Sequence, residues 1–155
     1  MLKYLFVLIL TFSSFARTTV EQIKINKPMI SDAYALRLAK VIKLKSDKYK
    51  IPANVITAIM RVESSYILSA VNKRSNDYGI MQINNYNIRA YKFDKDKLLT
   101  DLDYSIDAGC QVFKWFYRTY KDLDHAIQAY NGGTAKDVHE WKSTKDYLKK
   151  IKKFM

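Results

Sequence analysis

The chain contains one cysteine, two prolines and four glycines among its 155 residues. A single cysteine, Cys110, excludes an intramolecular disulfide, so the fold must be held by its apolar core, where we expect Cys110 as a small buried side chain. Scarce glycine and proline, together with apolar residues at helical spacing, favour a mainly α fold. The two histidines, His125 and His139, lack metal-ligand spacing, so no metal site and no cofactor is predicted.

Acidic residues are also few. The chain has 27 lysines and arginines against 15 aspartates and glutamates, a net charge of +12. Such a surface attracts polyanions, which could be nucleic acid, anionic lipid or an acidic cell-wall polymer. The sequence contains no zinc-finger spacing or other nucleic-acid-binding motif, so nucleic acid is not expected as a partner.

The apolar run from Tyr4 to Phe12 is shorter than the roughly 20 residues that span a bilayer. It follows a positive start at Lys3, and Ser14 and Ala16 occupy the positions that a signal peptidase reads. We therefore predict a cleaved signal peptide over residues 1–16 and a periplasmic or secreted protein. No cysteine follows the cut, so no lipid anchor is expected.

The remaining chain is predicted to be an N-terminal arm over residues 17–30 and one helical domain over 31–155. The arm shows no clear period, and residues 66–93 are dominated by polar, turn-forming residues. Caps and apolar stripes predict five helices, over residues 32–49, 53–65, 102–120, 123–131 and 143–153.

Glu63 is the main candidate for chemistry. It lies on the second predicted helix, on the same face as the apolar residues Ile56, Ile59 and Met60. Burial among apolar side chains raises the pKa of a carboxyl group, as a general acid near neutral pH requires. An ion pair with a basic neighbour such as Arg61, or a solvated helix end, is the alternative that spacing alone leaves open.

Three blocks occur in order around this residue: Glu63-Ser64, then Gly79-Ile80-Met81-Gln82 after a polar loop, then Ala129-Tyr130-Asn131. Together they resemble the soluble lytic transglycosylase (SLT) family of the lysozyme-like superfamily. The resemblance covers residues 49–147. It implies a single lysozyme-like helical domain with a substrate cleft, and an enzyme that cuts the glycan strands of bacterial peptidoglycan.

Carried over by position, the resemblance makes Glu63 the catalytic acid. Gln82 and Asn131 can bond both donors and acceptors on a sugar, and Met81 offers an adaptable apolar surface, although a core role for Met81 is equally plausible from its spacing. The weakest match is Tyr147, which corresponds to a tyrosine near the end of the family's domain that closes the cleft. The substrate-binding residues expected in this way are Ser64, Ser75, Asp77, Tyr78, Gly79, Met81, Gln82, Tyr130, Asn131 and Tyr147.

In that family one glutamate protonates the bond between N-acetylmuramic acid and N-acetylglucosamine, then takes a proton from the 6-hydroxyl, leaving a 1,6-anhydro end. Asp77 leaves a hydrolytic alternative open. The segment Ser75-Asn76-Asp77-Tyr78-Gly79 also resembles the loop of c-type lysozymes, in which the aspartate is the second catalytic carboxylate. A muramidase would use Glu63 and Asp77 together. C-type lysozymes are usually disulfide-rich, which favours the transglycosylase.

The last predicted helix suggests a rival of another class, a non-enzymatic cationic protein that binds the wall or the membrane. An ordinary solvated face is the simpler interpretation of this helix. Peptidoglycan strands are the expected partner of a monomeric enzyme, and a secretion or cell-envelope machine is a further candidate. The lysines concerned are Lys142, Lys145, Lys149, Lys150, Lys152 and Lys153.

Overall fold

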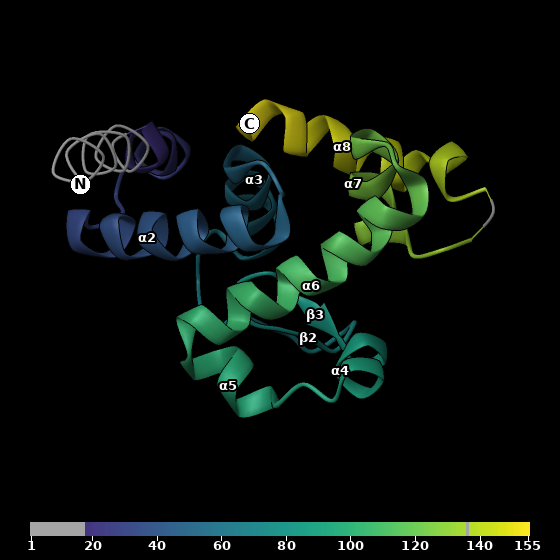
Figure 1. Cartoon of the computed structure of the whole chain (residues 1–155), viewed down its shortest axis with the longest axis horizontal. Helices are drawn as coiled ribbons and strands as arrows, with labels where there is room; N and C mark the ends of the chain where they lie inside the picture. Colours follow the sequence, from purple (N-terminus) through teal and green to yellow (C-terminus); the bar gives the residue numbers. More distant parts are fainter. Residues whose placement is uncertain (1–17, 136) are drawn as a thin grey trace, which may run out of the picture.

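The computed structural model of the protein describes residues 18–135 and 137–155 (Figure 1). The predicted signal peptide over residues 1–16 therefore lies outside the described residues. The five predicted helices are all present and agree with the expected bounds to within one or two residues. They are α2 (Asp32–Tyr49), α3 (Ala53–Ser64), α6 (Leu102–Tyr120), α7 (Leu123–Gly132) and α8 (Lys142–Phe154).

Side-chain caps explain where several helices begin. The Ser31 hydroxyl accepts from the Tyr34 amide at the start of α2, and the Asp122 carboxylate accepts from the His125 amide at the start of α7. Such acceptors satisfy amide groups that have no partner within the helix. The predicted positions of these helices followed from the same residues.

The segment between α3 and α6 contains structure that the sequence did not predict. Three two-residue strands, β1 (Val71–Asn72), β2 (Asp77–Tyr78) and β3 (Ile83–Asn84), form an antiparallel sheet in that order. Two short helices follow, α4 (Asn85–Tyr91) and α5 (Lys95–Thr100), and a 3-10 turn, η1 (Val138–Glu140), precedes α8.

Within the expected arm, residues 18–26 form a helix that packs on the domain, and the sequence did not predict this helix. Ile23 is fully buried in the core. The Gln22 amide donates to the Phe154 carbonyl at 2.8 Å, and the Asn26 amide donates to the same carbonyl at 3.0 Å. The helix within the arm was not predicted because polar amides, rather than an apolar stripe, provide much of its anchoring.

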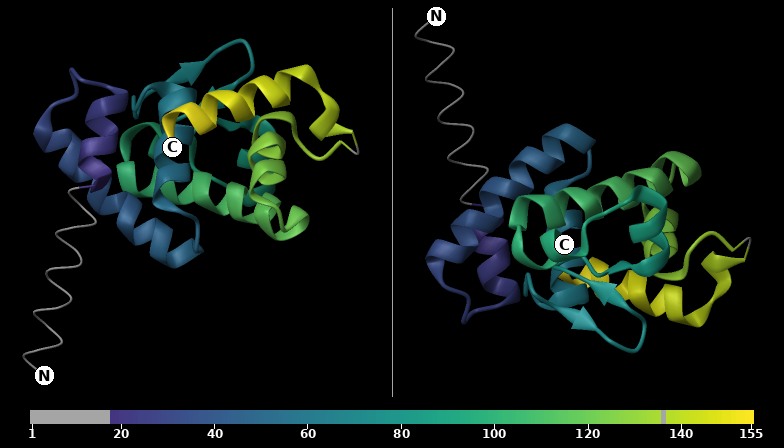
Figure 2. Two further views of the ribbon diagram at one scale, coloured as in Figure 1. Left: turned by 90° about the horizontal axis from the view of Figure 1, so that it is seen from above. Right: turned by 90° about the horizontal axis from the view of Figure 1, so that it is seen from below.

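The core is one continuous apolar cluster with α6 at its centre. Helix α6 contacts α2, α5 and α7, and α8 packs across α3 and α7 (Figure 2). Cys110 is buried on α6, as predicted. Among the described residues, no helix is both long and apolar enough to cross a membrane.

Candidate active site

Glu63 occupies the last turn of α3, where α8 crosses that helix. Its side chain is half-buried. The Tyr147 hydroxyl, on the buried side of α8, donates to Oε1 of Glu63 at 2.5 Å. The structure thus joins the predicted acid to the tyrosine that was the weakest of the expected matches.

The surroundings of Glu63 raise its pKa from 4.5 to about 7. Burial is the largest cause, because it disfavours the charged form, and the negative charge of Asp77 acts in the same direction. The hydrogen bond from Tyr147 opposes both, since it stabilises the carboxylate. At neutral pH the carboxyl group can therefore exist in either form, which suits a group that gives and then takes a proton.

Ser64 faces inward. Its hydroxyl donates to the Ile80 carbonyl at 2.8 Å and to the Met60 carbonyl at 3.2 Å, and the residue is buried. The hydrogen bond to Ile80 holds the segment from Gly79 to Gln82 against α3. Ser64 therefore positions the site, and its hydroxyl does not reach the surface where a sugar would lie.

Gly79 adopts a left-handed conformation with φ of +82°, and a Cβ there would lie 2.5 Å from the Leu98 carbonyl oxygen. This close approach explains the glycine. The Gln82 amide donates to the Gly79 carbonyl at 2.9 Å and to the Ala70 carbonyl at 3.2 Å. Both residues shape the turn that links the strands β2 and β3.

Met81 belongs to the core. Only 1% of its surface is exposed, and it packs so closely on α6 that a Cβ on Gly109 would lie 2.3 Å from its sulfur. The expectation that the Met81 side chain touches a sugar is not supported by this placement, because the side chain points away from solvent. Its carbonyl oxygen accepts a hydrogen bond from the Tyr130 hydroxyl at 2.8 Å.

Tyr130 borders Glu63 and the neighbouring cleft. Burial raises the pKa of its hydroxyl well above the ordinary value, and the charge of Glu63 adds to that effect. Its ring packs edge-on against Phe116 at 6.4 Å between centroids. The raised pKa keeps the Tyr130 hydroxyl in its protonated form, in which it donates the hydrogen bond to the Met81 carbonyl.

Asp77 and Tyr78 form strand β2 and are both half-buried. The Ser75 hydroxyl hydrogen-bonds the Asp77 carboxylate. The ammonium group of Lys95 lies over the Tyr78 ring, 4.8 Å from its centroid. The structure thus brings Ser75 and Asp77 together, and the negative charge of Asp77 acts on Glu63.

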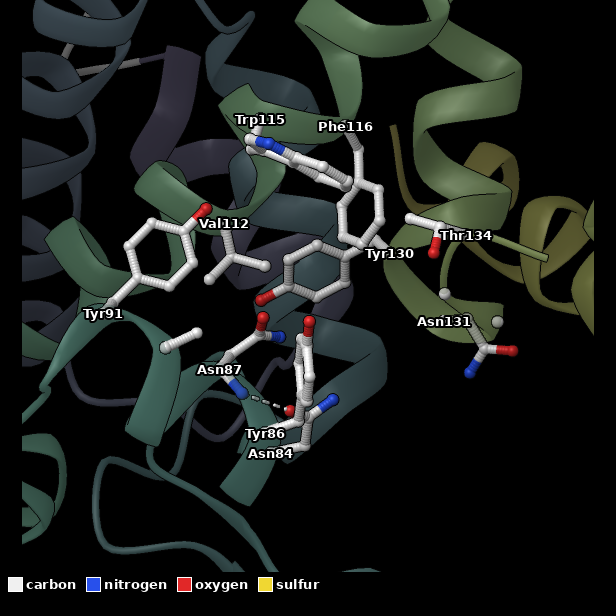
Figure 3. A pocket seen from close by; sticks show the side chains of 13 residues that line it. Asn84, Tyr86, Asn87, Tyr91, Val112, Trp115, Phe116, Tyr130, Asn131 and Thr134 are labelled. Atoms are coloured by element: carbon white, nitrogen blue, oxygen red, sulfur yellow. Dashed lines mark hydrogen bonds between the residues drawn. The ribbon is translucent and has the colours of Figure 1, made fainter.

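A cleft of about 550 Å³ lies beside Tyr130. Trp115 of α6 and Tyr86 of α4 stand on opposite sides of it, with Tyr130 between them (Figure 3). Trp115 and Tyr86 are 47% and 73% exposed, unusually high for such large rings. The lining residues are Asn84, Tyr86, Asn87, Ala90, Tyr91, Val112, Trp115, Phe116, Tyr130, Asn131, Gly132, Gly133 and Thr134.

None of the side chains that line the cleft is charged, although the chain as a whole is strongly basic. Aromatic rings and amides are the groups that bind uncharged sugar rings. Glu63 is not a lining residue, and Tyr130 is the residue that links the two, because it lines the cleft and its hydroxyl feels the charge of Glu63. Of this set, the sequence motifs mark only Tyr130 and Asn131, because Tyr86 and Trp115 lie in no recognisable motif.

Among the described residues, no three histidine, cysteine, aspartate or glutamate side chains gather where they could share a metal ion. One carboxyl group of raised pKa, Glu63, instead acts on Tyr130, which lines an uncharged cleft. Residues 40–154 match the family model of the transglycosylase SLT domain. The chain belongs to this family.

Two curated relatives of this SLT domain are the proteins IpgF of Shigella flexneri and of Shigella sonnei. They are 33% and 32% identical to it over 95 residues. The aligned region is 57% of this chain and spans 62% of the length of each relative.

Solved structures show the same fold at low identity. The 70-kDa soluble lytic transglycosylase SLT70 of Escherichia coli matches with a TM-score of 0.66 at 17% identity, over 92% of this chain and 29% of that one. An inactive mutant of lytic transglycosylase Slt from Pseudomonas aeruginosa matches with a TM-score of 0.62 at 14% identity, over the same shares. These likenesses confirm the predicted single, mainly helical, lysozyme-like domain.

Proposed function

We propose that this SLT domain is a peptidoglycan lytic transglycosylase. It would cleave the β-1,4 bond between N-acetylmuramic acid and N-acetylglucosamine without water and leave 1,6-anhydro-N-acetylmuramic acid ends. The observation that carries the proposal is the carboxyl group of Glu63, whose pKa is raised to about 7 beside an uncharged, aromatic-lined cleft. Membership of the family supports the same reaction.

In this reaction the protonated Glu63 donates its proton to the glycosidic oxygen as the bond to the leaving sugar breaks. The resulting carboxylate then accepts the proton of the 6-hydroxyl on the same muramic acid, whose oxygen closes the ring on the anomeric carbon. The enzyme regains its proton in the second step. A single group with a pKa near neutrality can perform both transfers.

The neighbours of Glu63 would hold it for this exchange. Tyr147 fixes one carboxylate oxygen, so the other is left to meet the glycosidic oxygen. Asn131, on the exposed end of α7, is suited to bond a sugar hydroxyl or acetamido group. Ser75, Tyr78 and Gln82 are proposed to line the opposite side of the bound strand.

A muramidase is the second candidate, and Asp77 is the observation that favours it. Its charge acts on Glu63, and the Ser75 hydroxyl orients its carboxylate. In a hydrolase Asp77 would form a covalent intermediate or activate water. In a transglycosylase the same aspartate would only tune the pKa of Glu63 and stabilise positive charge on the sugar.

Mass spectrometry of the soluble fragments released from purified peptidoglycan decides between these reactions. Anhydro-ended fragments from the wild type, absent with Glu63→Gln, are expected. Reducing ends would make the protein a muramidase with Asp77 at the centre of the mechanism. The matched control is Glu140→Gln, since Glu140 lies on the surface in an ion pair with Lys145 and should leave the products unchanged.

A non-enzymatic wall-binding role would be indicated instead if neither wild type nor Glu63→Gln released fragments while both bound the wall. We further propose that the protein acts in the periplasm or outside the cell, after removal of residues 1–16. Peptidoglycan strands are then its partner. Association with a secretion or cell-envelope machine, and action as a monomer, remain part of this proposal.

A further inference from the structure

Helix α8 has two sharply different sides. Its inner side carries Tyr147 and Ile151, which are buried. The outer side carries six exposed lysines and a single acid, Asp146. Lys142, Lys145 and Lys149 follow one another at three- and four-residue steps, and the other three lysines lie close to that row, so the six share one broad side of the helix. They are Lys142, Lys145, Lys149, Lys150, Lys152 and Lys153.

Three of the six lysines are neutralised within the fold. Lys142 pairs with Asp146, and Lys152 pairs with Asp124 of α7. Lys145 pairs with Glu140 of η1 at 2.9 Å. These pairs are surface contacts that stabilise the fold only slightly.

The other three lysines, Lys149, Lys150 and Lys153, form no salt bridge with any of the described residues. They lie one to four positions apart, which places them together near the C-terminal end of α8. Like charges at such spacing repel one another, so this arrangement weakens the isolated helix slightly. A partner with negative charge would relieve that repulsion.

Apolar side chains stand beside Lys153. A shallow groove at the end of α8 is lined by Lys153 and Met155 and, from the N-terminal helix, by Ile25 and the acidic Glu21, together with polar residues. Ile25 is 78% exposed and Met155 is 38% exposed. The hydrogen bonds from Gln22 to the carbonyls of residues 154 and 155 hold the two segments together. Exposed apolar residues flanked by lysines are typical of segments that lie in a bilayer interface.

We propose that Lys149, Lys150 and Lys153, together with Ile25 and Met155, form a docking surface for an anionic phospholipid bilayer, which we term the α8 basic surface. The lysines would meet the headgroup phosphates, and the two apolar side chains would enter the interface below them. A hydrated wall polymer offers the same negative charge but no apolar layer. The exposed Ile25 and Met155 therefore favour the bilayer as the occupant.

The surface is separate from the cleft. Figure 1 shows the end of α8 beside the N-terminal helix, whereas the cleft is lined from α4, α6 and α7. The α8 basic surface and the cleft share no residue. Docking would accordingly leave the cleft open to a glycan strand in the wall above the membrane.

The test is sedimentation of the protein without residues 1–16 in the presence of vesicles. Binding to vesicles of phosphatidylglycerol and phosphatidylcholine is compared with binding to vesicles of phosphatidylcholine alone. Wild type should bind only the anionic vesicles. Each lysine near an anionic surface contributes about fivefold to binding, so the combined substitution Lys149→Gln, Lys150→Gln and Lys153→Gln should weaken it roughly a hundredfold. Ile25→Ser should remove the part of the binding that survives high salt.

The matched control removes three exposed lysines elsewhere and should stay within a few-fold of wild type. Circular dichroism of each variant establishes that it is folded. Equal loss in both triple variants, or equal binding to neutral vesicles, would overturn the proposal. So would wild-type binding to purified wall but not to vesicles, which would assign these lysines to a wall polymer. Glu63→Gln should bind vesicles like wild type, which separates this test from that of catalysis. The control lysines are Lys40, Lys92 and Lys121.

Discussion

Replacing Glu63 by glutamine should change how the stability of the protein depends on pH. The folded-state pKa of Glu63 is about 7, above the ordinary value of 4.5 expected in the unfolded chain. A group whose pKa is raised by folding contributes stability below its unfolded pKa and loses it as the pH rises through its folded pKa. Between these two values the native protein holds a proton that the unfolded chain has released, so wild-type stability should fall as the pH rises.

The expected size follows from the displacement of the pKa from 4.5 to about 7. At about 1.4 kcal/mol for each unit, the free energy of unfolding of wild type should fall by at most about 3.5 kcal/mol over this range, relative to Glu63→Gln. Partial contact of the carboxyl group with solvent makes this an upper value. Urea unfolding of both proteins followed by circular dichroism, from about pH 4 to about pH 8, measures the difference.

Glu140→Gln is the control, because this exposed carboxylate has its pKa lowered by the hydrogen bond from Lys145. A lowered pKa adds stability above the unfolded value, so any dependence on pH should be small and opposite in sign. A constant difference between wild type and Glu63→Gln across the whole range would refute the reasoning. It would mean that Glu63 is not desolvated and lacks the property on which the acid–base role rests.

Three further outcomes are expected. Asp77→Asn removes a charge that raises the pKa of Glu63, so the alkaline limb of the pH–activity profile should move to lower pH. The rate should stay within about tenfold for a transglycosylase and fall by about 10² to 10⁴ for a muramidase. Tyr147→Phe removes a hydrogen bond that lowers that pKa, so the same limb should move to higher pH. Gly109→Ala would set a Cβ 2.3 Å from the Met81 sulfur, and overpacking should lower the free energy of unfolding in urea by about 1–3 kcal/mol.

The long helices could be predicted because each has several turns of apolar spacing and a recognisable end. In α2 the buried residues Ala35, Leu38 and Ile42 repeat at helical steps after the Ser31 cap. A pattern repeated over many residues survives the loss of any one position. The same reasoning placed Glu63 on an apolar stripe, and the structure supports the raised pKa inferred from it.

The short elements could not be predicted, since a strand of two residues has no period to detect. Helices α4 and α5 are only seven and six residues long, and their signals were the caps Asn84 and Asp94, whose side chains accept from following amides. Asparagine and aspartate in a polar stretch favour turns just as strongly. Only contacts with distant segments, such as the amide of Asp94 donating to the Tyr104 hydroxyl, decide between them.

The direction in which a side chain points was the other feature that could not be predicted. A motif indicates that Ser64 and Met81 belong to the site, but not that both face the core. Conversely, Trp115 lies off the apolar stripe of α6 and no motif marks it, yet it lines the cleft. Whether a side chain on α6 faces the core or the cleft depends on the position of α4. The spacing of apolar residues within α6 gives no information about that position.

Helix α8 links the catalytic proposal to the membrane proposal without making one depend on the other. Its inner side supplies Tyr147 to Glu63, and its outer side carries Lys149, Lys150 and Lys153. The causes that set the pKa of Glu63 are burial, Tyr147 and Asp77, and no lysine of α8 is among them. Neutralising the outer lysines should therefore change where the protein binds while leaving the pH profile of cleavage of soluble glycan fragments unchanged. The pH profile depends on the hydrogen bond from Tyr147, which lies on the inner side of α8. An unchanged profile would therefore also show that α8 keeps its position in the lysine variants.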